Sequence, residues 1–472
     1  MEYICSIDIL IVALYLLIVF LVGMIAGRNV KNLNEYAVAG RSYRSLVLFA
    51  TLSASFIGGG YSSGNAAKVF SGGIGFAITL WGFSVALFFI SMKLAPKMDN
   101  FRHCISVGDI MGINLGKRGR IIAGILGCVL CTGVLAAQVG AMGAVFSTYT
   151  SLTSAQGILL GCGIVIIYTT FGGMHSVVLT DVVQFTVLVI MIPLSLWIGL
   201  QELGGIEVFL TKIPLEHTQI FNDELTPALF IGLFLSFLVG ESLSPPYIQR
   251  LLAGRNASIT SRGVFFSALL SIPFFLVTGA IGLLALAVSP TMDANEAMPY
   301  ILKVILPIGL RGLAIAAVVS IVMSSADSFL NSAVICLIRD VAEPIFGPKL
   351  TEHPLRELSI ARLLSLSIGI SSVIIAMSIP NVMDILLFSY QFYAPVIVAS
   401  LVMTLLGKSF SWGTFVIGAF CGSVSVIIML IGGGEHAASV HSIVVGTVVG
   451  VSAFFVSYWF EQYVAERKEV TT

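Results

Sequence analysis

Oxygen-bearing side chains gather within a few residues of one another in an otherwise apolar segment of the chain. Ser324, Ser328 and Asn331 recur at helical spacing and share one face, and Ser325 and Asp327 flank that face. Hard cations such as Na⁺ bind in small cages of several oxygen ligands, which hydroxyl and carboxylate groups can supply. The structural alternative is that the serines bond back to carbonyls one turn earlier and let helices pack closely. With an aspartate beside the serines, we favour a cation site.

Two helix-length apolar segments, about residues 46–71 and 226–250, are interrupted at their middles. Three glycines, Gly58 to Gly60, break the first, and Ser244 with two prolines breaks the second. Within a bilayer, each unpaired backbone amide costs several kcal/mol, so an interruption there needs a reason. Paired interruptions in the two halves of a chain point to a transporter binding site. Carbonyls freed at the first break could join the serine hydroxyls around a cation.

Three carboxylates are expected at membrane depth: Asp181, Glu241 and Asp327. Each costs about 2.5–3.5 kcal/mol at a helix centre, which argues for a cation, a proton or a basic partner. Asp181 could instead lie in a first helical turn near the cytoplasmic interface. Glu241 could bind a substrate ammonium or pair with Lys68 or Arg250. Asp327 could be a cation ligand or a hydrogen-bonding group between packed helices.

The composition is that of an integral membrane protein. The chain has 472 residues, of which 57% are hydrophobic and 10% charged, and its mean hydropathy is +1.02. The formal net charge is zero, so no nucleic-acid partner is expected. The chain has no G-x-x-x-x-G-K-[ST] motif, and its hydrophilic stretches are too short for a nucleotide-binding domain. We therefore expect neither an enzyme nor an ATP-driven pump.

The hydropathy pattern predicts an all-α protein with about 13 transmembrane helices. Lys and Arg concentrate in alternate loops, which predicts an N-terminus outside and a C-terminus in the cytoplasm. The expected spans lie at roughly 7–27, 46–71, 74–94, 121–149, 155–171, 177–200, 226–250, 262–289, 309–338, 358–379, 383–406, 411–432 and 439–461.

The spans suggest a LeuT-type core of two five-helix repeats. Because each repeat has an odd number of spans, the second repeat has the opposite orientation in the membrane. The two interrupted segments occupy corresponding positions in these halves. The expected organisation is 1–45 for the first span and a cytoplasmic loop, 46–200 for the first repeat, 201–225 for an extracytoplasmic loop, 226–406 for the second repeat, and 407–472 for two peripheral spans and a short cytoplasmic tail.

Three separated motifs resemble the sodium:solute symporter family, and within it most closely the high-affinity choline transporter branch. They are the run 324–328, the run 176–184 after two glycines, and the run 247–250. The resemblance covers about residues 7 to 460. It implies a sodium site made by two hydroxyls and three carbonyls, which match Ser324, Ser325, Ala54, Ile57 and Ile321. It also implies a possible second sodium site, which matches Asp181, Asp327 and Ser328.

The solute is expected beside the two breaks. Candidate contacts are Phe56, Gly59, Tyr61, Gln138, Glu241 and Ser244. Choline-transporting relatives have tryptophans at positions that match Phe56, Val134 and Ser244, so one aromatic side chain of three remains for cation–π contact. A solute other than choline is therefore favoured, from among amino acids, carboxylates, sugars and choline-like amines.

Together these features predict a Na⁺-coupled symporter that imports a small organic solute by alternating access. We expect it in a lipid bilayer, in a bacterial inner membrane, and functional as a monomer. Three alternatives stay open: a proton-coupled carrier of the same fold, a passive channel, and a transporter-like sensor.

Overall fold

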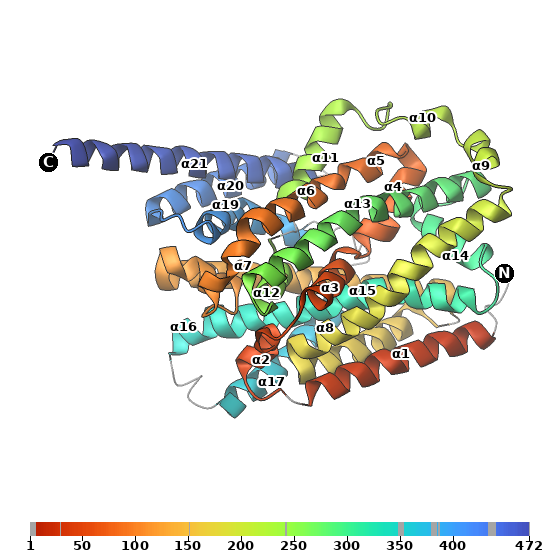
Figure 1. The fold of residues 1–472 in the computed structure, drawn as a ribbon, viewed down its shortest axis with the longest axis horizontal. Helices are drawn as coiled ribbons and strands as arrows, with labels where there is room; N and C mark the ends of the chain where they lie inside the picture. Colours follow the sequence, from red (N-terminus) through yellow and green to blue (C-terminus); the bar gives the residue numbers. More distant parts are fainter. Residues whose placement is uncertain are drawn as a thin grey trace.

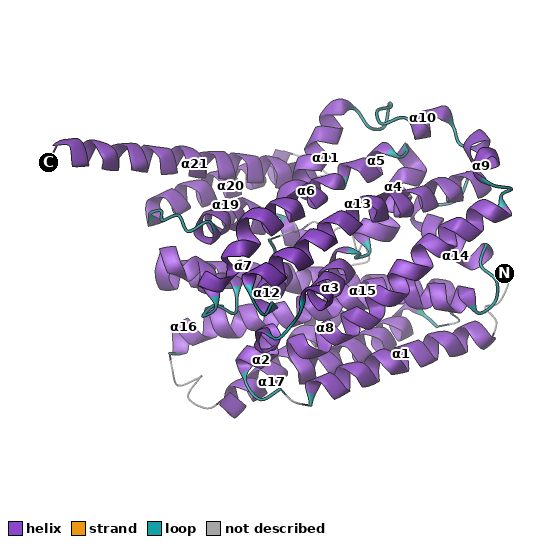
Figure 2. Cartoon of the chain, in the orientation of Figure 1, coloured by secondary structure: helices purple, strands orange, loops and turns teal. Residues whose placement is uncertain are grey.

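The protein is built from helices joined by short loops (Figure 2). This computed structural model describes residues 6–28, 30–150, 152–240, 243–347, 354–378, 385, 388–432 and 440–471. In this part of the chain, the β-type pairing found is an isolated parallel bridge between Tyr43 and Gly254. The predicted all-helical class is thus confirmed for these residues.

Ten helical stretches of the described chain are long and apolar enough to cross a membrane. They are α1 (Ser6–Gly27), α5 to η4 (Gly75–Phe101), α7 (Val107–Tyr149), α8 (Ser154–Glu202), α13 (Ala257–Val288), α15 to α16 (Leu310–Phe346), α17 (Pro354–Ser378), Phe388–Leu405 with α19 (Tyr393–Leu405), α20 (Trp412–Gly432), and α21 (Val440–Thr471) within which Ser442–Arg467 qualifies.

The shorter elements either connect these spans or are the helical pieces of the spans Gly75–Phe101 and Leu310–Phe346. They are α2 (Leu33–Val38), η1 (Ala39–Arg41), α5 (Gly75–Thr79), α6 (Trp81–Phe89), η3 (Ile90–Leu94), η4 (Ala95–Phe101), α9 (Ile206–Lys212), α10 (Leu215–Thr218), η5 (Ala294–Glu296), α14 (Ala297–Val304), η6 (Cys336–Ala342) and α16 (Glu343–Phe346). In Figure 1, α9 and α10 lie at one end of the bundle and α16 lies at the other.

The first predicted break is present. α3 (Ser45–Phe56) stops just before the glycines, and η2 (Gly60–Gly64) continues directly into α4 (Asn65–Gly72). The segment Gly60–Gly72 is bent by 61° relative to α3. Counting this bent pair as one span raises the number of candidate spans in the described residues to 11. The predicted count of thirteen is therefore not confirmed.

One source of the difference lies in α8, which contains two of the expected spans. Gly173 has non-helical backbone angles (φ 51°, ψ −139°) within it. On either side, Tyr168 and Thr180 both donate to Oδ2 of Asp327, at 2.7 and 3.3 Å. A straight helix would separate their Cα atoms by about 18 Å, farther than two side chains bonded to one oxygen can reach. The two arms of α8 therefore fold back toward each other at Gly173.

The other source is the expected span 226–250, which the structure resolves into α11 (Pro227–Val239) and α12 (Pro245–Ala253). Neither helix alone is long enough to be counted as a span. Two prolines occupy the first turn of α12, where a missing N–H removes no helical hydrogen bond. Glu241, the predicted substrate residue between these helices, lies outside the described residues.

α15 (Leu310–Ile335) is the centre of the bundle, since every residue from Ala314 to Ile335 is buried. A helix buried on all sides is a core helix, and its polar residues must find partners inside the protein. Its start is fixed to α1 by Asp8, whose carboxylate accepts from the Gly309 and Gly312 amides at 2.8 and 2.9 Å and from Arg311 Nε at 3.0 Å. Both partners of this ion pair are therefore largely withdrawn from solvent.

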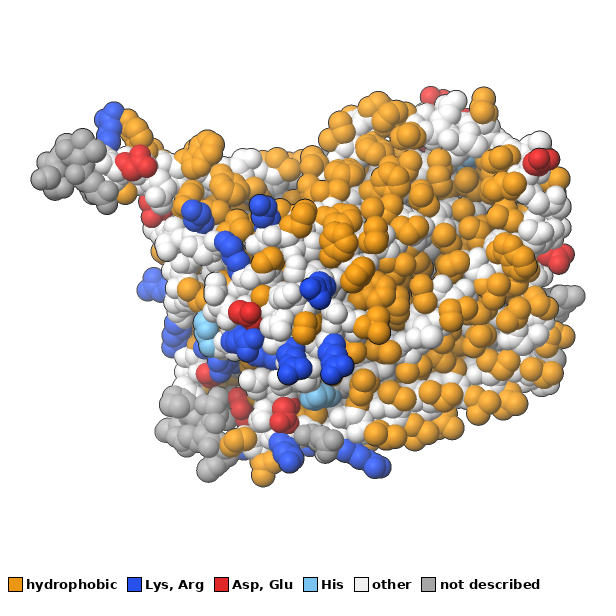
Figure 3. Space-filling view, in the orientation of Figure 1, with side chains coloured by type: hydrophobic (Ala, Val, Ile, Leu, Met, Phe, Trp, Pro, Cys, Tyr) orange, Lys and Arg blue, Asp and Glu red, His pale blue; other side chains and the backbone are white. Residues whose placement is uncertain are grey.

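The outer surface is apolar over most of the face shown in Figure 3, while Lys and Arg gather toward the end where α2 and α12 lie. Exposed residues include Leu14, Leu363 and Trp459, which are 49%, 65% and 73% exposed. Large apolar surfaces of this extent are covered by lipid in membrane proteins. The chain is an integral membrane protein.

Candidate functional site

A buried ion pair lies where α3, α8, α12 and α15 meet. The Asp181 carboxylate, on the second arm of α8, is fully buried. Its Oδ2 accepts from Thr51 Oγ1 at 2.5 Å and Arg250 Nη2 at 2.8 Å, and its Oδ1 accepts from Ser324 at 2.5 Å. Asp181 is thus a core residue bonded to three other helices, and the alternative of an interfacial first-turn residue is not observed.

Arg250 enters this site from α12 and is also fully buried. Besides Asp181, its guanidinium donates to Thr51 Oγ1 at 2.9 Å, to the Pro246 carbonyl at 3.2 Å and to Ser328 Oγ at 2.5 Å. A planar guanidinium with several acceptors is held in one orientation. Arg250 therefore ties the short helix α12 to the core through Asp181.

Asp327 is the second buried carboxylate of the site, and Ser328 lies between it and Arg250. Tyr168 and Thr180 donate to its Oδ2, and Ser328 Oγ contacts its Oδ1 at 3.1 Å. Among the described residues, no basic side chain forms a salt bridge with Asp327. With both aspartates ionised, two negative charges face one guanidinium. The site then has one uncompensated negative charge, which a cation or a proton would neutralise.

Ser325 contacts the break in the first interrupted helix. A Cβ built on Gly58 would lie 2.9 Å from Ser325 Oγ, so the hydroxyl and this backbone are in close contact. Ser325 also donates to the Ile321 carbonyl at a long 3.3 Å. Ser324, one residue earlier, gives its hydrogen to Asp181 and keeps lone pairs that can face a cation. Ser324 therefore bonds to the Asp181 carboxylate, while Ser325 lies against the first break.

The end of α3 offers backbone oxygens beside Ser325. The hydrogen bonds recorded for the described residues include no donor to the carbonyls of Ala54 and Ile57. The chain leaves the helix at Ile57, so the amides that would have bonded these carbonyls turn away. Bare carbonyls and a serine hydroxyl are ligand types that suit Na⁺. The structure thus places Gly58, which directly follows the predicted carbonyl ligand Ile57 in sequence, against Ser325.

A matched pair of glycine substitutions tests this contact. Gly58→Ala would put a methyl group 2.9 Å from Ser325 Oγ, whereas a Cβ at Gly60 meets nothing within 4 Å. We expect Gly58→Ala to raise the Na⁺ concentration needed for half-maximal stabilisation by about tenfold, which equals about 1.4 kcal/mol. Gly60→Ala should leave this Na⁺ concentration within about twofold of its value in the unchanged protein. The measurement is a thermal-shift titration with NaCl at constant ionic strength, and equal effects of the two substitutions would contradict the assignment.

Aromatic rings surround the other side of the break. Tyr61 stacks on Phe275 with ring centroids 5.6 Å apart, and Phe56 lies 5.5 Å from Phe83. The rings come from the first break, α6, α11, α12 and α13. The members of this aromatic cluster are Phe56, Tyr61, Phe83, Phe237, Tyr247 and Phe275. Two predicted solute residues, Phe56 and Tyr61, are therefore brought together by further aromatic rings, of which Phe83, Phe237 and Phe275 gave no signal in the sequence.

Buried polar atoms without protein partners mark places for water or a ligand. In the described part of the chain, Gln138 Oε1 and Ser244 Oγ are two such atoms. A Cβ on Gly59 would lie 3.9 Å from Gln138 Oε1, so these two predicted residues are neighbours. Ser244 precedes α12, whose Tyr247 ring lies 6.0 Å from Phe83 of the aromatic cluster.

Several residues of the site were missed by sequence reasoning. Thr51, Tyr168 and Thr180 are single polar residues in apolar helices, and a lone hydroxyl gives no signal before its partner is known. Phe83 and Phe275 likewise look like ordinary packing residues. Arg250 did carry a signal, because a cation in an apolar segment needs an acid, although its partner is Asp181.

The fold and the site define a helical membrane protein whose buried charges lie between interrupted helices. The chain belongs to the sodium:solute symporter family, whose model matches residues 36–453. It is similar to the high-affinity choline transporter 1 of Drosophila melanogaster (29% identical, covering 79% of this chain and 62% of the relative). It is also similar to the human high affinity choline transporter 1, which is 27% identical over 90% of this chain and 76% of the relative. The Vibrio parahaemolyticus sodium/glucose cotransporter is 23% identical over 74% of this chain and 71% of the relative.

Solved structures show the same fold. A Na⁺-coupled sialic acid symporter in a substrate-bound outward-open state has a TM-score of 0.82 at 20% identity, covering 97% of this chain and 98% of that chain. Mhp1, a nucleobase-cation-symport-1 family transporter, has a TM-score of 0.57 at 14% identity, covering 92% and 95%. These likenesses support the predicted LeuT-type architecture, while the boundaries of the two five-helix repeats stay a prediction.

Proposed function

We propose that this protein is a Na⁺-coupled symporter that imports a small organic solute by alternating access, and that it is not an enzyme. The observation that carries the proposal is a core site in which two buried carboxylates, Asp181 and Asp327, share one guanidinium, Arg250, in a bundle whose helix α3 ends in bare carbonyls at the first break. A transported cation satisfies both features. The names of the relatives and of the solved symporters agree with this class of activity.

In this proposal the main Na⁺ ion binds between the first break and α15. Its ligands are the Ser324 and Ser325 hydroxyls and the carbonyls of Ala54, Ile57 and Ile321. The contact between Gly58 and Ser325 supports the assignment, because it joins the two elements that supply the ligands. An ion held between a broken helix and a core helix stabilises one relative position of the two, which is the basis of coupling.

A second cation would bind at Asp181, Asp327 and Ser328, where two buried carboxylates share one guanidinium. For Asp327→Asn we expect uptake to remain Na⁺-dependent while the Hill coefficient for Na⁺ falls from about 2 to about 1. Asp99→Asn, at an exposed carboxylate, is the control. An unchanged Hill coefficient together with lost pH dependence would instead make Asp327 the proton site of a proton-coupled carrier.

The proposed solute site is bounded by Phe56, Gly59, Tyr61, Gln138 and Ser244, with Glu241 as the candidate counter-ion for an amine. Ring faces accept an apolar or cationic part of a solute, and unpartnered polar atoms accept its hydroxyl or amide groups. The relatives named for choline, glucose and sialic acid define the range to be tested. Because the aromatic cluster supplies rings that the sequence alone did not reveal, choline-like amines are the first solutes to test.

We also propose a bacterial inner membrane as the location, with the N-terminus outside, the C-terminus in the cytoplasm and a functional monomer. The gathering of Lys and Arg at one end of the molecule supports the orientation (Figure 3).

The test is uptake into proteoliposomes made with purified protein. A panel of radiolabelled amines, amino acids, sugars and carboxylates is offered with an inward Na⁺ gradient, an inward K⁺ gradient, or a pH gradient alone. A symporter concentrates one solute above equilibrium with Na⁺, since about 2.3 kcal/mol per charge is gained at 100 mV. If the solute only equilibrates across the membrane, the protein is a channel. If a pH gradient alone drives accumulation of the solute, it is a proton-coupled carrier. If no solute is taken up, it is a sensor.

A further inference from the structure

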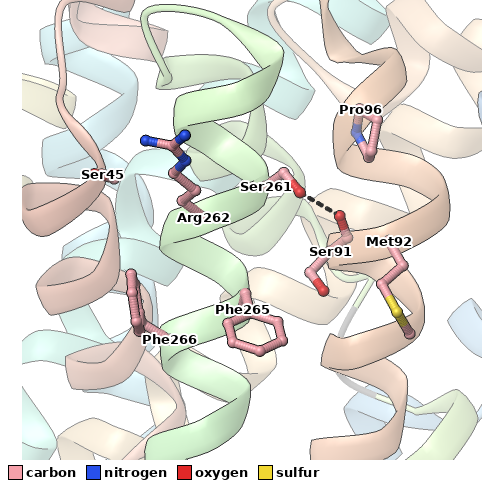
Figure 4. A pocket seen from close by; sticks show the side chains of 8 residues that line it. All are labelled: Ser45, Ser91, Met92, Pro96, Ser261, Arg262, Phe265 and Phe266. Carbon is pink, nitrogen blue, oxygen red and sulfur yellow. Dashed lines mark hydrogen bonds between the residues drawn. The ribbon is translucent and has the colours of Figure 1, made fainter.

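A hollow opens on the outer surface between α3, the η3–η4 segment and α13, away from the ion pair. Its volume is about 610 Å³. Figure 4 shows its wall, where Ser261 Oγ of α13 donates to the Ser91 carbonyl of η3 at 2.5 Å. The lining residues are Ser45, Ser91, Met92, Pro96, Ser261, Arg262, Phe265 and Phe266.

The hollow has one cationic side chain and no acidic one among its lining residues. Arg262 is exposed, and the described residues give its guanidinium no ion pair or hydrogen bond. In Figure 4 this side chain extends toward the start of α3 at Ser45. The first turn of α3 has no side-chain cap, so its amide groups add to the positive potential there. The hollow is therefore suited to an anion.

The rest of the hollow is apolar. Phe265 and Phe266 follow Arg262 by about one helical turn, or about 5 Å along α13. They are 42% and 50% exposed, and Met92 across the hollow is 60% exposed. A charged end followed by an apolar wall matches a molecule with an anionic head and a hydrocarbon tail. Free phosphate would contact the cationic end at Arg262 and leave the apolar wall uncovered.

The location fits such a molecule. α13 begins at Ala257 and α3 at Ser45, so the hollow lies near the ends of both helices. This is also the end of the molecule where basic residues gather (Figure 3). An arginine there lies at the depth of phospholipid headgroups, with the phenylalanines at the depth of the acyl chains.

We propose that this hollow is a binding site for an anionic phospholipid, whose phosphate pairs with the Arg262 guanidinium and whose acyl chain lies against Phe265, Phe266 and Met92. Guanidinium and phosphate form charge-assisted paired hydrogen bonds, which favour this headgroup contact. The bound lipid would bridge α13 and the start of α3, the helix whose other end carries Ala54 and Ile57. The inference is independent of the solute and of the Na⁺ assignment.

The experiment is native mass spectrometry of delipidated, detergent-purified protein titrated with phosphatidylglycerol or phosphatidylcholine. For the unchanged protein we expect one bound phosphatidylglycerol with an affinity at least tenfold above that for phosphatidylcholine. Arg262→Gln should reduce this preference to about twofold or less. Phe265→Ala with Phe266→Ala should lower the binding affinity for both lipids by similar factors, because both lipids place an acyl chain against these rings.

Arg118→Gln is the matched control, since Arg118 is exposed in α7 and is not part of this hollow. It removes the same charge and should keep the tenfold preference. The proposal is overturned if Arg262→Gln keeps that preference, if Arg118→Gln loses it equally, or if millimolar inorganic phosphate displaces the lipid. A thermal melt of each variant confirms that the folded protein was titrated.

Discussion

Replacing both Ser324 and Ser325 by alanine is expected to abolish Na⁺-dependent uptake while the protein still folds. The two substitutions remove both hydroxyl ligands of the proposed main Na⁺ site, and Ser324→Ala also removes a 2.5 Å hydrogen bond to Asp181. At about 1.5 kcal/mol or more for each interaction with a charge, the Na⁺ affinity should fall at least about 100-fold. Initial rates of uptake against Na⁺ concentration measure the effect.

The control is Ser367→Ala with Ser371→Ala on α17. These two serines are exposed and bond back to carbonyls four residues earlier, at 2.9 and 2.8 Å, so the chemical change is the same outside the site. This control should retain the normal Na⁺ dependence. If Ser324→Ala with Ser325→Ala also retains it, the serines serve only helix packing, the alternative considered from the sequence.

Breaking the buried ion pair is expected to have the largest effect on stability. Arg250→Gln leaves Asp181 and Asp327 buried without the guanidinium that contacts Asp181 at 2.8 Å. Loss of one partner of such a pair costs about 3–5 kcal/mol, because the remaining charge is uncompensated. A chemical or thermal unfolding series in detergent should show this loss at neutral pH.

A double substitution separates the pair itself from the isolated charge. Asp181→Asn with Arg250→Gln should recover part of the stability lost by Arg250→Gln, since no unpaired charge is left at that pair. As a surface comparison, Asp99→Asn removes the exposed pair with Arg102, 2.9 Å apart, and should cost about 1 kcal/mol or less. If Arg250→Gln were as mild as Asp99→Asn, the ion pair would not support the core.

Much of the site's chemistry could be predicted from the sequence because the signals were local. The serines and Asp327 of α15 stand out as polar residues in an apolar segment. The glycines at the first break and the prolines of α12 are direct signals of an interrupted helix, and both interruptions are present. Helical class and membrane location likewise follow from composition and hydropathy alone.

The partners of these residues could not be predicted, since they depend on how distant helices pack. Asp181 and Arg250 are far apart in sequence, and either could have been assigned to another charge. The aromatic cluster draws rings from five different parts of the chain, each of which resembles ordinary packing on its own. Gly173 shows the same limit for the fold, because its backbone turn decides whether α8 is one long helix or two arms.

The central claim is coupling between Na⁺ and an organic solute, and thermal stabilisation of the purified protein tests it most directly. A library of amines, amino acids, sugars and carboxylates is screened in NaCl and in KCl at equal ionic strength. Because a ligand at 100 times its Kd stabilises by about 2.7 kcal/mol, a specific solute gives a clear shift. Our account predicts one solute class that raises the melting temperature in Na⁺ and has little effect in K⁺. A solute equally effective in K⁺ would contradict Na⁺ coupling.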